Sequence, residues 1–148
     1  MDELELEFVL HPQLQADCVV LGDLPLCRLL LMNDANYPWF ILVPRRAEVT
    51  EVYHLSVEDQ VQLTRESASL AETLADTFAA RKMNIAALGN VVPQLHIHHV
   101  VRYEKDPAWP APVWGKIAAV PYSSERIDSI RQRLELLLQG DLEFAPHH

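Results

Sequence analysis

The segment Gln94–Arg102 (QLHIHHVVR) constrains the fold more than any other part of the chain. It places three of the seven histidines within a run of branched aliphatic residues, which favour a β-strand. Side chains alternate between the faces of a strand, so one face is predicted to carry Gln94, His96, His98, Val100 and Arg102, and the other Leu95, Ile97, His99 and Val101. The Cα atoms of His96 and His98 would then lie roughly 7 Å apart, so both imidazoles can address one group.

Length and composition indicate one domain over residues 1–148, large enough for its own hydrophobic core. Cys18 and Cys27 show no metal-binding spacing and favour reduced thiols in the cytoplasm. The acidic start at residues 1–7 disfavours a signal peptide, which begins with basic residues. No apolar run approaches the length of a membrane helix. The net charge of −9 disfavours binding to a nucleic-acid polymer, but a focused pocket can still bind one small anion.

The pattern of the whole chain predicts an α+β fold. We expect strands at 18–24, 26–33, 39–43, 83–88 and from residue 94 onward, separated by turns at 22–25, 34–38 and 89–90. A long helix is expected from 56 to about 82, with Ser56 as its N-cap, and a second from Ser123 or Ser124 to Gly140. Residues 1–17 are predicted to form an amphipathic lead-in interrupted at His11 and Pro12, and 106–112 an extended loop.

The order of these elements contains only one long helical crossover. It therefore favours an antiparallel sheet of about five strands packed by two main helices over a doubly wound sheet. The continuous apolar character of 39–43 predicts a central strand, buried on both faces.

The residues alone leave three interpretations of the histidine pair. The histidines can be structural. They can be two metal ligands, with a third from His11, His54 or a carboxylate such as Glu104. Alternatively, one imidazole attacks phosphorus while its neighbour binds the phosphate, because a neutral nucleophilic nitrogen is available near physiological pH.

Residues 89–101 (GNVVPQLHIHHVV) resemble the signature of the histidine triad (HIT) superfamily, in which three histidines alternate with hydrophobic residues a few positions after a glycine. The resemblance extends upstream through 27–33 and 40–46 (FILVPRR) and covers residues 18–103. The segment AWPAPVWG at 108–115 resembles that of a bacterial HIT-like subgroup. The resemblance implies a HIT-like fold with its core at 18–103, a Trp/Pro loop and helix at 104–140, and a homodimer.

The resemblance also implies roles for single residues. His96 falls on the middle histidine, the nucleophile, and His98 on the third, a phosphate contact. Gln94 stands where the family has its first histidine. Gly89 and Asn90 match residues near the phosphates.

The implied ribose contact falls on Asn33 or Asp34, which the sequence does not separate. His99 is expected to be packed or partly exposed on the opposite face from His96. Arg102 faces either a phosphate or solvent. Trp109 and Trp114 are expected to pack in the structure, cover a pocket, stack on a base or fill a dimer contact.

The function implied is that of a cytoplasmic enzyme, a nucleotide hydrolase or transferase. It would act on a dinucleoside polyphosphate or nucleoside phosphoramidate through a nucleotidyl-histidine, without a metal or other cofactor. Because Gln94 replaces a histidine, the alternative is a nucleotide-binding module without turnover. A His-x-His metal-binding protein is a further alternative.

Overall fold

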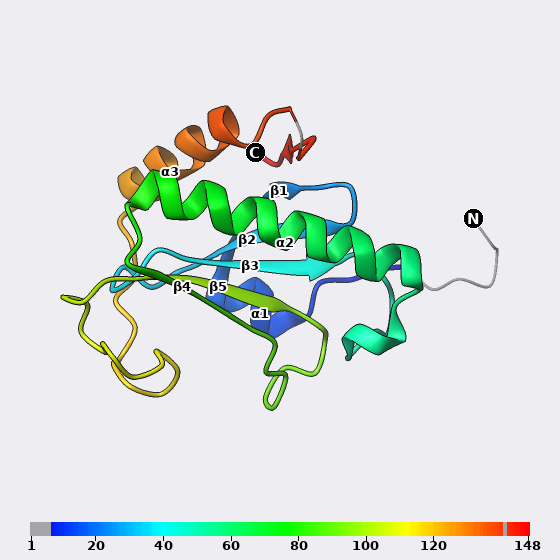
Figure 1. The fold of residues 1–148 in the computed structure, drawn as a ribbon, viewed down its shortest axis with the longest axis horizontal. Coiled ribbons are helices and arrows are strands. Elements are labelled where there is room, and N and C mark those ends of the chain that lie inside the picture. The colour runs from blue at the N-terminus through cyan, green and yellow to red at the C-terminus, as the bar shows by residue number, and fades with distance from the viewer. Residues whose placement is uncertain (1–6, 141) are drawn as a thin grey trace.

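A six-stranded antiparallel sheet, in the order β4-β5-β3-β2-β1-β6, lies at the centre of the computed structural model (Figure 1). The structure describes residues 7–140 and 142–148, so residues 1–6 of the acidic start, on which the expectation of no signal peptide depends, lie outside the described residues. The strands are β1 (Cys18–Asp23), β2 (Cys27–Met32), β3 (Trp39–Pro44), β4 (Lys82–Ala86), β5 (Ile97–Arg102) and the short β6 (Ala145–Pro146).

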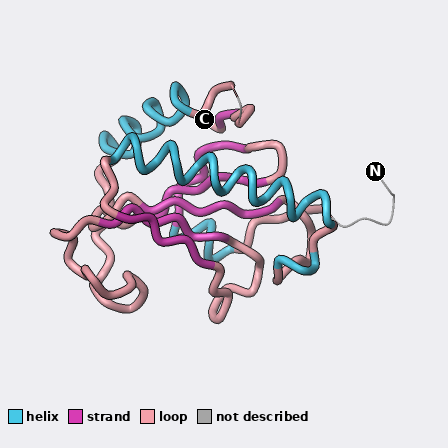
Figure 2. Tube along the Cα trace, in the orientation of Figure 1, coloured by secondary structure: helices cyan, strands magenta, loops and turns pink. Residues whose placement is uncertain are grey.

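The helices are α1 (Pro12–Asp17), α2 (Val57–Phe78) and α3 (Ser124–Leu137), with a 3-10 turn, η1, at Val52–His54. Figure 2 shows how these helices and the long loops surround the strands. The predicted α+β class with an antiparallel sheet is therefore confirmed, and β6 adds a sixth strand to the five expected. No helix in the described part of the chain is long and apolar enough to cross a membrane.

Two apolar clusters hold the layers together, one on each face of the sheet. The helices α2 and α3 cover one face through Leu70, Leu74, Ile130 and Leu134, which pack with Phe40. On the other face, Leu14 of α1 and Val113 of the long loop pack on the sheet with Ile41 and Val100. Every residue of β3 is buried between β5 and β2, which confirms the prediction of a central strand.

Several predicted boundaries were wrong, including the ends at 88 and 140, where β4 stops at Ala86 and α3 at Leu137. Three others have a clear local reason. His11 and Pro12 do not interrupt a lead-in, because they begin α1: the His11 ring accepts the Gln13 N–H and Pro12 occupies the first helical position. The helix α2 ends at Phe78, before residue 82, because Ala79 turns left-handed at φ 51°. The strand β5 starts at Ile97 and not at residue 94, since the Leu95 N–H bonds to the Val49 carbonyl at 2.9 Å.

Candidate active site

His96 and His98 lie side by side where β5 begins. Their ring centroids are 4.9 Å apart, and the two residues are 6% and 5% exposed. His99 points to the opposite face, where its Nε2 accepts a hydrogen bond from Ser67 of α2 at 2.7 Å. The alternation predicted from the sequence is thus confirmed, and His99 is a fully buried packing residue.

Among the described residues, the His96 ring has a hydrogen-bond partner at one of its two nitrogens. Its Nδ1 lies 2.6 Å from the backbone carbonyl oxygen of Gln94. A carbonyl only accepts, so Nδ1 must carry the proton, and in the neutral ring Nε2 keeps its lone pair. Burial lowers the pKa of His96, this hydrogen bond opposes the lowering, and the proximity of His11 adds to it. His96 therefore presents a neutral, nucleophilic nitrogen at physiological pH.

His98 is enclosed by two tryptophans. The Trp39 indole Nε1 donates to Nδ1 of His98 at 3.0 Å, and the Trp114 ring centroid lies 5.2 Å from that of His98. Burial, and then the neighbouring His96 and His99, lower the pKa of His98 to about 3. His98 is consequently uncharged near neutral pH.

The Gln94 side chain ties the N-terminal segment to the site. Its Oε1 accepts from the His11 backbone N–H, and its Nε2 donates to the Val9 carbonyl, both at 2.9 Å. The backbone carbonyl of Gln94 thus bonds to His96, while the side-chain amide of Gln94 holds residues 9–11 in place. The effect of His11 on the pKa of His96 reflects this proximity.

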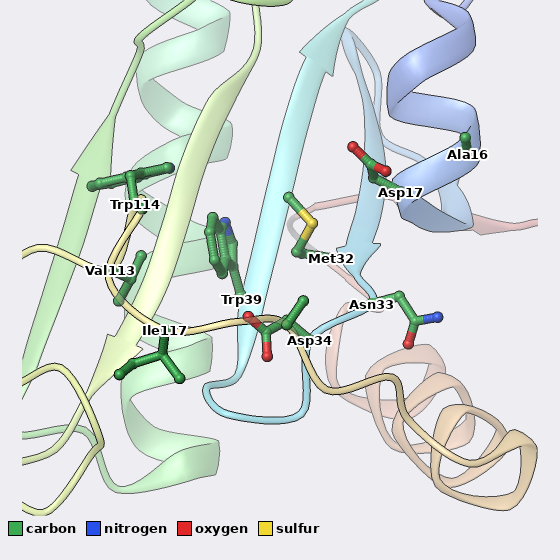
Figure 3. Close-up of a pocket in the computed structure, with 11 residues that line it drawn as sticks. Ala16, Asp17, Met32, Asn33, Asp34, Trp39, Val113, Trp114 and Ile117 are labelled. Atoms are coloured by element: carbon green, nitrogen blue, oxygen red, sulfur yellow. The ribbon is translucent and has the colours of Figure 1, made fainter.

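Asn33 and Asp34 line a pocket of about 400 Å³ next to His98, together with Trp39 and Trp114. In Figure 3 the Trp39 ring lies between Trp114 and Met32. Asn33 accepts the Tyr122 N–H at 2.8 Å. The pocket adjoins the histidine pair because Trp39 and Trp114 contact His98 as well.

Asp34 is 4% exposed and belongs to the frame of this pocket. Its Oδ1 accepts hydrogen bonds from the backbone and side chain of Asn36 and from the Val120 N–H. These bonds join the turn after β2 to the loop that precedes α3.

Gly89 and Asn90 lie in the turn that connects β4 to the histidines. Gly89 has φ +77°, a conformation that favours glycine, and it lines a small pocket of about 30 Å³ with Gln94 and His96. Asn90 is exposed and is not among the residues lining that pocket. The structure therefore brings the backbone of this turn near His96, and the Asn90 side chain lies outside the small pocket.

Arg102 shares the histidine face but is buried, neither open to solvent nor free for a phosphate. It forms a two-pronged ion pair with Asp106, at 2.9 and 3.1 Å, and donates to the Ala111 carbonyl at 2.8 Å. The Trp109 ring packs over its guanidinium, 5.6 Å from the ring centroid. This ion pair holds in place the loop after β5, and that loop positions Trp114 beside His98.

Sequence reasoning missed two contributors. The sequence pattern indicates only a strand position for Trp39 and only a loop position for Asp106. Trp39 is 59 positions from His98, and only the register that pairs Ile41 with His98 brings them together. Its position on the face of Ile41 and Val43 was available from alternation, but the identity of the neighbouring strand was not.

Within residues 7–140 and 142–148, no group of three or more His, Cys, Asp and Glu side chains is placed to hold a metal ion. Glu104, considered above as a third ligand, pairs with Arg81 at 2.9 Å. The described residues therefore supply two imidazoles to a metal and no third ligand from these residue types.

This fold and site define a class: an α+β protein that presents two neutral imidazoles at the start of an inner strand, beside an aromatic-lined pocket. The HIT domain family model matches residues 13–105. The chain belongs to the HIT domain family, whose members are generally nucleotide hydrolases and transferases.

Solved structures agree with this assignment over most of the chain. A histidine triad protein from Marinobacter aquaeolei VT8 is 51% identical, with a TM-score of 0.89, covering 90% of this chain and 98% of its own. One from Bradyrhizobium japonicum is 39% identical, with a TM-score of 0.87 and coverages of 89% and 98%. One from Sinorhizobium meliloti 1021 is 44% identical, with a TM-score of 0.86 and coverages of 88% and 97%. No curated protein matches the chain.

Proposed function

We propose that the protein is a nucleotide hydrolase or transferase that acts on a nucleoside 5′-phosphoryl compound, such as a dinucleoside polyphosphate or a nucleoside phosphoramidate. The observation that carries this proposal is the bond between Nδ1 of His96 and the Gln94 carbonyl, which leaves the lone pair of the neutral ring on Nε2. A fixed neutral imidazole beside a second imidazole suits covalent catalysis at phosphorus.

The reaction proceeds in two displacements. His96 Nε2 attacks the α-phosphorus and forms an N–P bond, while the bond to the leaving group breaks and that group departs with the electron pair and takes a proton from solvent. Water then attacks the same phosphorus, the N–P bond breaks, the nucleoside monophosphate is released and the proton returns to solvent. In a transferase, another hydroxyl replaces water.

The surroundings of His96 favour the first displacement. The ring becomes positively charged as the N–P bond forms, and the Gln94 carbonyl accepts from the ring N–H that shares this charge. His98, 4.9 Å away between ring centroids, contacts the phosphoryl oxygens. The turn at Gly89 closes the phosphate site from the side of β4. Most of the rate gain is expected from this positioning.

The nucleoside occupies the 400 Å³ pocket beside His98. Its base packs against Trp39, Trp114 and Met32, which line that pocket. We assign the ribose contact to Asn33, because the buried Asp34 directs Oδ1 into bonds with Asn36 and Val120. Asp34 then stabilises the turn that carries Asn33, through its bonds to Asn36 and Val120.

We further propose that the protein is a homodimer joined at β4. This strand ends the sheet, so its outer edge has backbone groups available for pairing. Ile85 and Leu88 are about half exposed beside this edge, and Val91 is 88% exposed. Light scattering after size exclusion should give twice the 16.9 kDa mass of the chain. Ile85→Lys should give a monomer, because a charge beside this edge disfavours pairing between two copies of the strand.

Turnover by the wild type and by His96→Ala tests the proposed activity. A fluorogenic adenosine phosphoramidate and diadenosine polyphosphates are the substrates, and His148→Ala is the control for loss of an exposed histidine. We expect His96→Ala to lose at least a thousandfold in kcat and the control to match the wild type. Equal rates for wild type and His96→Ala would refute the assignment.

The alternative function is a nucleotide-binding module without turnover. The observation that favours it is the commitment of the Gln94 amide to residues 9–11, at the position of the first triad histidine. Calorimetry that shows binding of a nucleoside monophosphate, with no turnover of either substrate class, would support this alternative.

A further inference from the structure

The hydrogen bond between Trp39 and His98 has a fixed direction. The indole Nε1 can only donate, so the His98 Nδ1 at 3.0 Å must accept. A neutral imidazole carries one proton, which therefore sits on Nε2 of His98. The neighbouring ring has the reverse arrangement, because its Nδ1 donates to the Gln94 carbonyl.

We propose that Trp39 is a positioning residue that fixes the neutral His98 ring with its proton on Nε2, so that His98 donates to a phosphoryl oxygen and has no free nitrogen with which to attack phosphorus. This inference rests on the proposed function for its consequence, but the tautomer itself can be tested without it. Two chemically identical side chains thereby take different roles, with His96 as nucleophile and His98 as donor.

The surroundings of both rings support this division. Trp39 and His98 are 7% and 5% exposed, so solvent does not compete for the indole N–H. A hydrogen bond to the lone pair of a neutral ring also opposes its protonation, in the same direction as the burial that lowers the pKa of His98 to about 3. His98 thus remains a neutral donor throughout the physiological range.

Trp114 provides a matched comparison. Both indole rings contact His98, with centroid distances of 5.7 Å for Trp39 and 5.2 Å for Trp114, and both line the 400 Å³ pocket. Of the two, Trp39 is the one whose N–H bonds to the His98 ring. Replacing either tryptophan with phenylalanine shortens an aromatic side chain that lines the pocket, but only Trp39→Phe removes the donor to Nδ1 of His98.

Nitrogen NMR on protein with 15N-labelled histidine and tryptophan tests the tautomer directly. In the wild type we expect His98 to show a protonated Nε2, an unprotonated Nδ1 and a 15N–15N coupling through the hydrogen bond to Trp39 Nε1. Trp114→Phe should keep that coupling and Trp39→Phe should lose it. A protonated Nδ1 on His98 in the wild type would overturn the proposal, and this measurement needs no variant to fold.

Steady-state kinetics test the consequence. We expect kcat of Trp39→Phe to fall at least tenfold below that of Trp114→Phe, while KM rises in both because both lose part of an aromatic pocket wall. Equal kcat values in two folded variants would overturn the positioning role even if the hydrogen bond is observed. If the wild type itself turns over neither substrate class, the proposed function fails while the NMR result for the tautomer stands.

Discussion

Replacing His99 with glutamine is expected to remove part of the acid sensitivity of the fold. His99 is fully buried beneath α2, and its Nε2 accepts from Ser67 while its Nδ1 donates to the Ile97 carbonyl. Burial lowers its pKa from 6.5 to about 4, opposed only by the bond to Ile97. Glutamine can donate and accept in the same place but does not titrate.

The size of the effect follows from linkage. Below pH 6.5 the unfolded chain binds a proton at His99, whereas the folded protein does so only near pH 4. The stability from the neutral ring is thus complete above pH 6.5 and is lost as the pH falls toward 4. One pKa unit corresponds to about 1.4 kcal/mol, so the loss over this window is roughly 3 kcal/mol for His99.

Urea unfolding at several pH values between 7.5 and 4.5 measures this loss. His96 and His98 also have lowered pKa values, and His99 itself helps to lower that of His98, so the difference between the two proteins reports His99 together with its effect on His98. As the pH falls below 6, the unfolding free energy of the wild type should decrease relative to that of His99→Gln by up to about 1.4 kcal/mol per pH unit. Parallel curves for the two proteins would refute the reasoning.

Three other substitutions test separate contacts by urea unfolding and turnover. Asp106→Asn removes the only carboxylate that pairs with the buried Arg102 guanidinium among the described residues, so it should cost about 3–5 kcal/mol and should lower kcat/KM, because the loop that carries Trp114 loses this ion pair. Glu66→Gln should cost about 2–3 kcal/mol, because one carboxylate oxygen accepting from Leu26 or Cys27 becomes an NH2 group, with turnover unchanged. Gln94→Ala should cost about 1–3 kcal/mol yet keep measurable turnover, since the carbonyl that holds His96 remains. Unchanged stability in any of these variants would contradict the stabilising role assigned to its contact. Complete loss of turnover in Gln94→Ala would contradict the claim that the Gln94 backbone carbonyl alone holds His96.

The local pattern was sufficient to predict the parts of the site that lie on one strand. Alternation placed His96 and His98 together and His99 on the far face, because the period of two is a property of the extended backbone. The helix N-cap at Ser56 and the buried strand at 39–43 were likewise local signals. Each of these features depends on residues close together in the sequence.

The contacts that define the chemistry are not local. Gln94 bonds to residue 11, which is 83 positions away, and Trp39 to His98 across 59 positions. Such pairs depend on strand order and register, which one sequence does not specify. Arg102 shows the same limit. Alternation predicts the face on which Arg102 lies, but not the turn that brings Asp106 against its guanidinium. That ion pair makes Arg102 a structural residue and not a phosphate ligand.

A covalent adduct on His96 would test the central claim most directly. The protein is mixed with an adenosine phosphoramidate, quenched in alkali, which preserves N–P bonds, and digested for mass spectrometry within the first turnover. We predict one adenylyl group on His96 in the wild type and none on the same peptide of His96→Ala. An adduct on His98 instead, or turnover of the substrate with an unmodified His96 throughout, would contradict the account.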